Sequence, residues 1–284
     1  MMSKSEISSK SNNGSSPELV TLDRDHPGFR DVIYRNRRNL IAKHAIEHRR
    51  GDPVPLVEYT EAEHGVWREV WKNLDPLLSR HACQSYLDSL DRVSLSKEEI
   101  PQLRDVNRTL SRFGSLTLTP VAGLVQAKEF LLCLENRVFL ATQYIRHASA
   151  PLYTPEPDAI HELIGHAAFF ADERMLRLNR AFGTACRKNA EREDVILWLI
   201  RMYWYTIEFG LTRENGVRKA YGAGVLSSFG ELQKAMTHEN IQPFSIAQVM
   251  ETPFDPTDYQ SVLFEVPSLE ALEDQLQEWF EALS

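Results

Sequence analysis

The chain has 284 residues, of which 43% are hydrophobic and 25% are charged, a composition typical of a globular protein with a sizeable buried core. Its net charge of -8 comes without a concentrated positive surface, so we expect no nucleic-acid partner. No apolar run approaches the roughly 20 residues of a membrane-spanning helix, and the polar N-terminus is unlike a signal peptide. We therefore expect a cytoplasmic protein without a membrane partner.

The periodicity of apolar residues predicts helices along most of the chain. Residues 1–22 are rich in Ser, Asn, Lys and Gly and predict a disordered tail in front of a single domain, residues 23–284. Within this domain we expect helices over residues 29–48, 61–78, 97–113, 127–135, 158–170, 191–209, 226–236 and 269–283. Short β-prone stretches are found at residues 115–119, 137–142 and 261–266. The predicted fold class is mainly α, with many helices and a few short β-strands.

The segment HELIGH, residues 161–166, separates two histidines by five positions. A zinc-protease helix carries H-E-x-x-H, with histidines four apart on one face, but Gly165 stands where the second histidine would be. On a regular α-helix, positions i and i+5 lie about 140° apart around the axis. His161 and His166 can therefore share one ion only near a helix end or through a local distortion of the helix.

A second segment, residues 194–210, carries a carboxylate in apolar surroundings. Its sequence DVILWLIRMYWYTIEFG is apolar nearly all the way round, which predicts a helix buried on most sides. Glu208 lies near its end, and a buried carboxylate is costly unless it is paired or binds a metal. With His161 and His166 it offers the two-histidine, one-carboxylate set that binds non-haem Fe(II). These residues alone also allow structural histidines and a Glu208–arginine pair.

Longer motifs surround these residues. They are YTPEPDAIHELIGH (153–166), YWYTIEFGL (203–211) and AYGAGVLSSFGELQ (220–233). Further blocks lie upstream, and they run from DHPGFRDVIYRNRR (25–38) to TQYIRH (142–147). In composition and order, these blocks strongly resemble the pterin-dependent aromatic amino acid hydroxylases, the family of the phenylalanine, tyrosine and tryptophan hydroxylases. The resemblance extends from residue 23 to the end of the chain and implies a single catalytic domain of this family.

The resemblance implies a metal ion and an organic cofactor. His161, His166 and Glu208 match the family's iron ligands, and Fe(II) would activate O2 together with tetrahydrobiopterin or a related tetrahydropterin. The loop PVAGL and a following aromatic ring resemble the pterin pocket; the matching residues are Val121, Gly123, Leu124 and Phe130. Without the resemblance, Phe130 would be interpreted as core packing.

Two further residues match positions close to the reaction. Glu162 matches an acid beside the pterin and the iron, and we expect it both to contact the cofactor and to act in catalysis. Its sequence context alone would indicate an exposed helix charge. Tyr203 matches a catalytic-site residue near the metal, although its aromatic surroundings would otherwise indicate a core position.

The amino acid substrate needs a cation for its carboxylate. Arg146 resembles the family's residue for this task, because a planar guanidinium binds a carboxylate through two parallel hydrogen bonds. Thr154 and Ser227 are expected to provide hydrogen bonds beside Arg146 in binding the substrate, and Trp204 resembles an aromatic wall of the substrate pocket. Without the resemblance, Arg146 would be interpreted as part of a surface ion pair.

Trp204 favours L-phenylalanine as the substrate, since the tryptophan hydroxylases of the family tend to have Phe there. We expect 4-hydroxylation to tyrosine, with phenylalanine 3-hydroxylation and tryptophan 5-hydroxylation as alternatives. The family places a substrate-selecting loop near residues 254–260, where Pro256 resembles none of the usual residues.

Two alternatives belong to other classes of protein. A zinc hydrolase would use Glu162 as its general base, and a binding module would keep the same pocket without activity. The final segment, residues 268–284, is amphipathic but contains only about two heptads, where a coiled coil needs three or four. We therefore expect a monomer.

Overall fold

The computed structural model describes residues 19–20, 22–49, 51–256 and 258–283. Most of the predicted tail, residues 1–22, lies outside the described residues. Of the part that is described, the amides of Leu19 and Val20 donate to Asn39 Oδ1 at 3.1 and 3.2 Å, and Leu22 is buried. The division of the chain into a tail and one domain stays a prediction.

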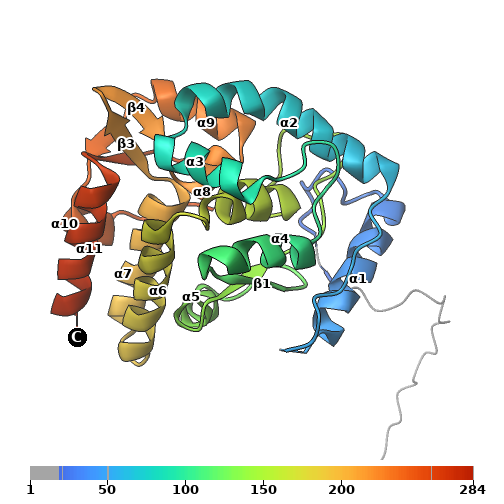
Figure 1. Ribbon diagram of the computed structural model, residues 1–284, viewed down its shortest axis with the longest axis horizontal. Helices are drawn as coiled ribbons and strands as arrows, with labels where there is room; N and C mark the ends of the chain where they lie inside the picture. The colour runs from blue at the N-terminus through green and yellow to red at the C-terminus, as the bar shows by residue number, and fades with distance from the viewer. Residues whose placement is uncertain (1–18, 21, 50, 257, 284) are drawn as a thin grey trace, which may run out of the picture.

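Helices form most of the described chain, which confirms the prediction of a mainly α fold with few short strands (Figure 1). The α-helices are α1 (Val32–Glu47), α2 (Glu61–His81), α3 (Gln84–Val93), α4 (Leu103–Leu110), α5 (Ala127–Glu135), α6 (Glu173–Lys188), α7 (Glu193–Tyr203), α8 (Ala223–Leu226), α9 (Phe229–Thr237), α10 (Ile246–Glu251) and α11 (Leu269–Ala282). Short 3-10 helices are η1 (Ser111–Phe113) and η3 (Ala167–Phe169). The π-helical segments are η2 (His161–His166) and η4 (Trp204–Glu208).

The strands form two small sheets. They are β1 (Thr117–Pro120), β2 (Val138–Ala141), β3 (Leu211–Glu214), β4 (Val217–Ala220), β5 (Ile241–Pro243) and β6 (Leu263–Val266). β1 and β2 pair in parallel, with Thr117 opposite Val138. The second sheet has the order β4-β3-β6-β5, in which β3 and β4 are antiparallel and the other pairs are parallel. The predicted strands near residues 115–119, 137–142 and 261–266 correspond to β1, β2 and β6.

Two predicted helices differ from the structure for local reasons. The helix expected over residues 97–113 begins only with α4, because Pro101 lacks an amide donor and disfavours helical conformation in the residue before it. The helix expected over residues 226–236 is divided into α8 and α9. Ser228 begins α9 by accepting a hydrogen bond from the Glu231 amide at 3.2 Å, as an N-cap does.

Hydrophobic periodicity did not reveal α3, α6, α10 or the hairpin of β3 and β4, although two of these carry usable signals. Asn215 and Gly216 form the hairpin turn with φ angles of 50° and 79°, the conformation that an Asn-Gly pair favours. In α6, the buried Met175, Leu178 and Phe182 follow a helical period among many charged residues. The high charge of this segment hides that period.

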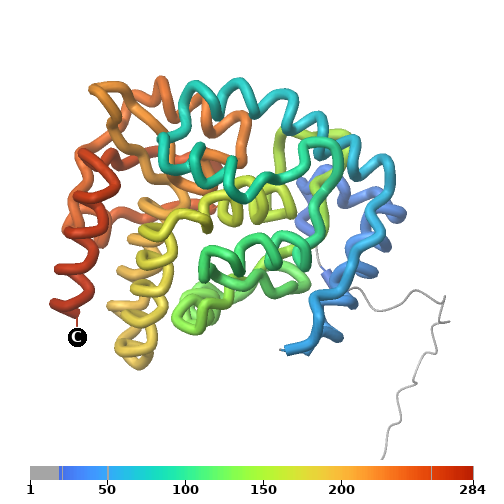
Figure 2. The backbone as a smooth tube through the Cα atoms, in the orientation of Figure 1, coloured from blue at the N-terminus to red at the C-terminus, as the bar shows by residue number. Residues whose placement is uncertain are grey.

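The core lies between helices that are distant in the sequence. In Figure 1, α1 and α11 lie at opposite ends of the molecule, and the tube in Figure 2 traces the chain between them. α6 contacts α5, α7 and α11. The approach of α5 to α6 requires a glycine, because a Cβ on Gly183 would lie 2.2 Å from the amide nitrogen of Glu135.

The amphipathic C-terminal segment packs within the chain. The apolar face of α11 is buried and comprises Leu269, Leu272, Leu276 and Trp279. Its acidic face meets α6, where Arg174 pairs with Glu270 and Arg177 with Glu273. This apolar face is therefore covered within the chain, and the expected monomeric state stays a prediction. No helix in the described chain is long and apolar enough to cross a membrane.

A pair of glycine substitutions tests the packing of α5 against α6. Gly183→Ala should lower the free energy of unfolding by about 1–3 kcal/mol, because the added methyl group meets backbone atoms. Gly65→Ala in α2 is the control; its Cβ would lie 3.9 Å from the nearest atom, so it should raise stability by about 0.5–1 kcal/mol. Urea unfolding measures both. If Gly183→Ala were as stable as the wild type, α5 and α6 would have to lie further apart than in this structure.

Candidate metal centre and active-site cavity

Two π-helical segments carry the three candidate metal ligands. In η2, the amide of Ala167 donates to the carbonyl of Glu162, five residues earlier. In η4, the amide of Phe209 donates to the carbonyl of Trp204 at 2.9 Å, again five residues earlier. Such hydrogen bonds define the π-helical turn, which occurs mostly as a single turn and frequently at functional sites. The HELIGH spacing therefore has the local helix distortion that it requires.

The three side chains meet at one point. The Nε2 atoms of His161 and His166 lie 3.1 Å apart. Glu208 Oε1 lies 3.0 Å from His166 Nε2, and Oε2 lies 3.6 Å from His161 Nε2. Within the described residues, these ligand atoms all lie within 4.8 Å of one another. Histidines, and not an arginine, thus compensate the partly buried Glu208 carboxylate.

Burial and charge set the protonation of this group. Burial lowers the pKa of His161 to about 4, despite the opposing charge of Glu208. Burial also lowers the pKa of His166, but the charge and hydrogen bond of Glu208 outweigh it, and the net shift is upward. Burial raises the pKa of Glu208, whereas the two histidines outweigh this and hold it below its usual range. Glu208 is therefore ionised, the form that binds a metal.

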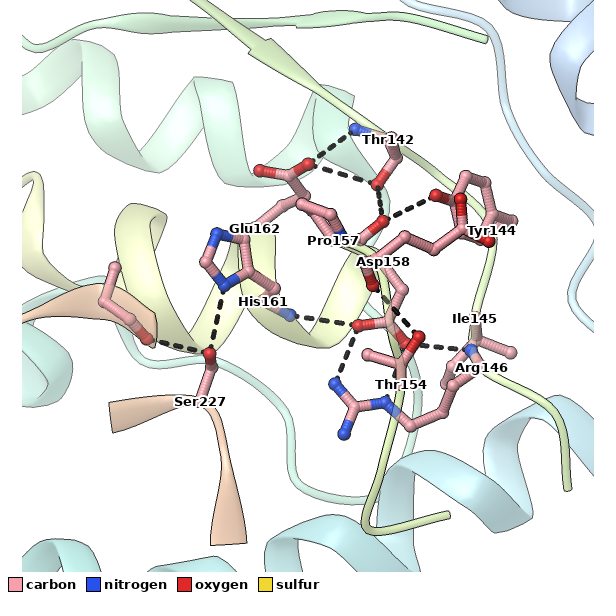
Figure 3. A network of polar contacts seen from close by, with 12 residues as sticks. Thr142, Tyr144, Ile145, Arg146, Thr154, Pro157, Asp158, His161, Glu162 and Ser227 are labelled. Atoms are coloured by element: carbon pink, nitrogen blue, oxygen red, sulfur yellow. Dashed lines mark hydrogen bonds and ion pairs between the residues drawn. The ribbon is translucent and has the colours of Figure 1, made fainter. Parts of the chain in front are cut away.

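Ser227 orients His161. Its hydroxyl donates to the carbonyl of Ala223 at 2.7 Å and lies 3.1 Å from His161 Nδ1 (Figure 3). Because the hydroxyl proton is used, the oxygen accepts from Nδ1–H, and the lone pair of the neutral imidazole lies on Nε2. Ser227 thus contacts a candidate metal ligand, and its expected part in binding the substrate beside Arg146 stays a prediction.

The placement of Ser227 depends on close contact between α8 and both π-helical segments. A Cβ on Gly165 would lie 2.7 Å from the carbonyl oxygen of Ala223, at the start of α8. A Cβ on Gly222 would lie 2.5 Å from the carbonyl oxygen of Glu208. Gly165 therefore permits α8 to approach η2, and Gly222 permits the approach to η4.

Arg146 forms a buried ion pair, which corrects the surface pair that its sequence context indicated. Its side chain is 4% exposed, and Asp158 is fully buried. Nε and Nη2 of Arg146 donate to the two Asp158 oxygens at 2.9 and 2.8 Å, and the Arg146 amide also donates to Asp158 at 2.8 Å. Asp158 accepts from the His161 amide at 3.2 Å as well. Figure 3 shows Asp158 between Arg146 and His161.

Thr154 forms a local hydrogen bond, and its expected part in binding the substrate stays a prediction. Its hydroxyl donates to the carbonyl of Glu156 at 3.0 Å, within the turn that precedes the metal-ligand segment. Figure 3 places Thr154 beside Arg146, but the hydrogen bond stabilises the turn.

A cavity of about 240 Å³ opens beside the three candidate ligands. Its lining includes every predicted cofactor residue, together with Tyr203 and Trp204. The polar lining residues are Thr142, His161, Glu162, His166 and Glu208; the others are Val121, Gly123, Leu124, Val125, Ala127, Phe130, Leu131, Phe139, Leu140, Pro157, Ile200, Tyr203, Trp204 and Phe254. Arg146, Thr154 and Ser227 do not line this cavity. It is therefore polar at the ligand end and largely apolar elsewhere.

Glu162 is buried in the cavity wall, so the interpretation as an exposed helix charge is wrong. It is 5% exposed, and its Oε1 accepts from the amide and the hydroxyl of Thr142, both at 3.1 Å. Burial raises the pKa of Glu162 to about 7. Thr142 was absent from the predicted site. Its position as the last residue of the β-prone stretch 137–142, directly after β2, could have indicated it.

Phe130 and Tyr203 form an aromatic wall. Their ring centroids lie 5.5 Å apart in an edge-to-face arrangement. The Tyr203 hydroxyl donates to Oδ1 of the buried Asn179 at 3.0 Å, and Asn179 donates to the carbonyl of Met175 at 2.8 Å. α6 therefore holds the phenol oxygen, while the Tyr203 ring lines the cavity.

Comparisons with known proteins agree with this site. Residues 10–284 match the sequence model of the biopterin-dependent aromatic amino acid hydroxylases. Human tyrosine 3-monooxygenase is 45% identical over 263 residues, which cover 91% of this chain and 49% of that protein. Phenylalanine-4-hydroxylase of Caenorhabditis elegans is 42% identical over 263 residues, covering 91% of this chain and 57% of that protein.

A solved structure adds the ligands of a relative. Phenylalanine hydroxylase from Chromobacterium violaceum, with bound iron(III) and oxidised cofactor 7,8-dihydrobiopterin, matches with a TM-score of 0.75 at 28% identity; the match covers 81% of this chain and 85% of that chain. The chain spans about half the length of the curated relatives named above. The match over residues 10–284 confirms the resemblance: this chain belongs to the family of biopterin-dependent aromatic amino acid hydroxylases.

Proposed function

We propose that this protein is an iron- and tetrahydropterin-dependent monooxygenase that hydroxylates the ring of a free aromatic amino acid. The observation that carries the proposal is the cluster of His161, His166 and Glu208 at the polar end of an otherwise apolar cavity. Two imidazoles and one carboxylate fit Fe(II), and such a set leaves coordination positions open. Bound Fe(II) and tetrahydropterin would together supply the activation of O2 for ring hydroxylation.

The chain's own residues would orient the cofactor. We propose that the loop containing Val121, Gly123 and Leu124 binds the pterin and that the Phe130 ring stacks on it, since all four line the cavity. Glu162 would hydrogen-bond the pterin from the metal side. Thr142 fixes its Oε1, so Oε2 is the oxygen outside that pair.

The substrate would be held at both of its ends. The two hydrogen bonds from Arg146 to Asp158 fix the guanidinium plane, and Nη1 is the nitrogen outside them. We propose that this nitrogen binds the substrate carboxylate, with Thr154 bracing the adjacent turn. The ring of the substrate would lie against Trp204 and Phe254, two aromatic residues of the cavity wall.

L-Phenylalanine is the first proposed substrate, with 4-hydroxylation to tyrosine. The cavity wall away from the ligands is largely apolar, which suits an unsubstituted ring. Tyrosine 3-hydroxylation is the second candidate, because human tyrosine 3-monooxygenase is 45% identical to this chain. An apolar pocket rejects an added hydroxyl group only weakly, by roughly 100-fold or less. Both reactions therefore suit the same cavity.

A competition experiment tests the proposed reaction. Protein loaded with Fe(II) is incubated in air with tetrahydrobiopterin and equal amounts of ¹³C-labelled Phe, unlabelled Tyr and unlabelled Trp, so that mass separates new tyrosine from added tyrosine, and products are identified by chromatography and mass. We expect tyrosine as the main early product, followed by 3,4-dihydroxyphenylalanine if the second candidate holds. Heat-denatured protein is the control. Pterin oxidation without any hydroxylated amino acid would contradict the substrate class, and no pterin oxidation would contradict the proposed function.

Substitution of the ligands tests the metal site. His166→Ala and Glu208→Ala should each lose stoichiometric iron and turnover, because two remaining ligands hold the ion poorly. They should also lose the rise in Tm that Fe(II) produces in the wild type by binding the folded state. His81→Ala, in the last turn of α2, is the control and should retain both. Full iron content in a ligand variant would remove that residue from the site; zinc with esterase activity would favour the hydrolase.

Arg146→Lys tests the proposed carboxylate site. A lysine keeps the charge but cannot form two parallel hydrogen bonds, so the KM of the amino acid should rise roughly tenfold or more. The KM of the pterin should change little. Thermal unfolding must accompany the kinetics, because Arg146 also pairs with the buried Asp158. An unchanged amino acid KM in a folded variant would place the carboxylate elsewhere.

A further inference from the structure

One part of the cavity wall comes from a segment without helix or strand. This wall segment, residues 254–256 and 258–260, lies between α10 and β6. The ring of Phe254 stacks on the indole of Trp204, with centroids 4.3 Å apart and planes inclined by 16°. Both rings line the cavity. The position of the wall segment therefore determines the shape of the cavity at Trp204.

Gln260 joins this wall segment to Trp204. It is 6% exposed, and its Oε1 accepts from Trp204 Nε1 at 2.8 Å. Its Nε2 donates to the carbonyls of Asp255 and Asp258 at 3.3 and 3.1 Å. Its own carbonyl lies 2.9 Å from His238 Nε2, on the side of α9. The buried side-chain amide of Gln260 thus contacts the Trp204 indole and two backbone carbonyls of the wall segment.

The chemistry of the amide group suits this position. A glutamine offers one oxygen acceptor and two N–H donors, and here the acceptor meets an indole donor while the donors meet two carbonyls. Glutamate would keep the acceptor and lose both donors. Leucine would lose all three contacts at similar size. A comparison of these two substitutions therefore separates the hydrogen bond to Trp204 from the hydrogen bonds to the carbonyls of the wall segment.

Trp204 also belongs to the metal-ligand segment. It begins η4, and Glu208 ends the same π-helical turn. The indole is therefore fixed on one side by the backbone that carries a candidate ligand, and on the other by Gln260 and Phe254. A substrate ring against this wall would be held at a set position relative to the metal centre.

We propose that Gln260 is a specificity-determining positioning residue: by joining Trp204 to the wall segment, it sets where the aromatic wall holds the substrate ring. This inference rests on the proposed function. Without Gln260, the indole and Phe254 are free to separate, and the cavity accepts a larger ring. The hydroxylation of tryptophan should then improve relative to that of phenylalanine, and less amino acid should be hydroxylated for each pterin oxidised.

The kinetic test compares Gln260→Leu, Gln260→Glu and wild type. In Gln260→Leu, the ratio of kcat/KM for tryptophan over that for phenylalanine should rise roughly tenfold. The pterin KM should change by less than about twofold, since Gln260 lies outside the predicted pterin residues. Gln260→Glu keeps the acceptor for Trp204, so its ratio of kcat/KM should lie between the ratios of Gln260→Leu and wild type. Gln242→Leu, an exposed glutamine of β5, is the matched control and should resemble wild type.

Hydrogen–deuterium exchange provides a readout that needs no activity. Amides in the wall segment should exchange faster in Gln260→Leu than in wild type, with Gln260→Glu intermediate and Gln242→Leu unchanged. Unchanged exchange in both Gln260 variants would overturn the inference. Faster exchange with an unchanged substrate ratio in an active enzyme would overturn the specificity role. If Gln260→Leu does not fold, the same comparisons are made with Gln260→Glu.

The two proposals can fail separately. If wild type hydroxylates no aromatic amino acid, the proposed function fails, and the exchange data still decide whether Gln260 holds the wall segment. If wild type is active and the Gln260 variants keep both its substrate ratio and its yield per pterin, the further inference fails and the proposed function stands.

Discussion

The partly buried carboxylate of Glu208 is the constraint on which the rest of the site depends. An anion enclosed by apolar side chains is unstable unless cationic or hydrogen-bonding groups meet it. His161 and His166 meet it from a segment that is distant in the sequence. Both segments are π-helical where they meet, and Gly165 and Gly222 allow α8 to pack against them. The candidate metal centre is thus a product of close packing between backbone segments.

Polar groups behind the site fix the positions of its side chains. Ser227 orients His161, Asp158 binds Arg146 and the His161 amide, and Thr142 fixes Glu162. Ser227, Asp158 and Thr142 come from different parts of the chain, and their contacts are buried or partly buried. Loss of one partner would leave a buried polar group unpaired, which costs more than the hydrogen bond contributes. We therefore expect this layer to respond cooperatively to substitution, and its geometry to be rigid.

The apolar part of the cavity works differently. Its wall residues contact a ligand through apolar surface rather than hydrogen bonds. Under the proposed function, selectivity among aromatic rings therefore depends on the positions of these wall residues. The described contacts fix two of these walls through polar groups behind the rings: Asn179 holds the Tyr203 hydroxyl, and Gln260 holds the Trp204 indole. The close approach at Gly183 keeps α5, which carries Phe130, against α6. Helices remote from the candidate metal ligands thereby define the apolar part of the cavity.

The sequence by itself determined the mainly α class, most helices with their approximate bounds, the family and the identity of the three candidate ligands. These features depend on local periodicity and on residue types that few other chemistries combine. Only the tertiary structure decided the π-helical turns, the burial of Arg146, the partners of Ser227 and Thr154, and the contacts of Gln260. Side-chain partners such as Trp204 and Gln260 are far apart in the chain, and no local pattern encodes which donor meets which acceptor. Packing makes that choice, because a buried polar group must find its partner wherever the fold places one.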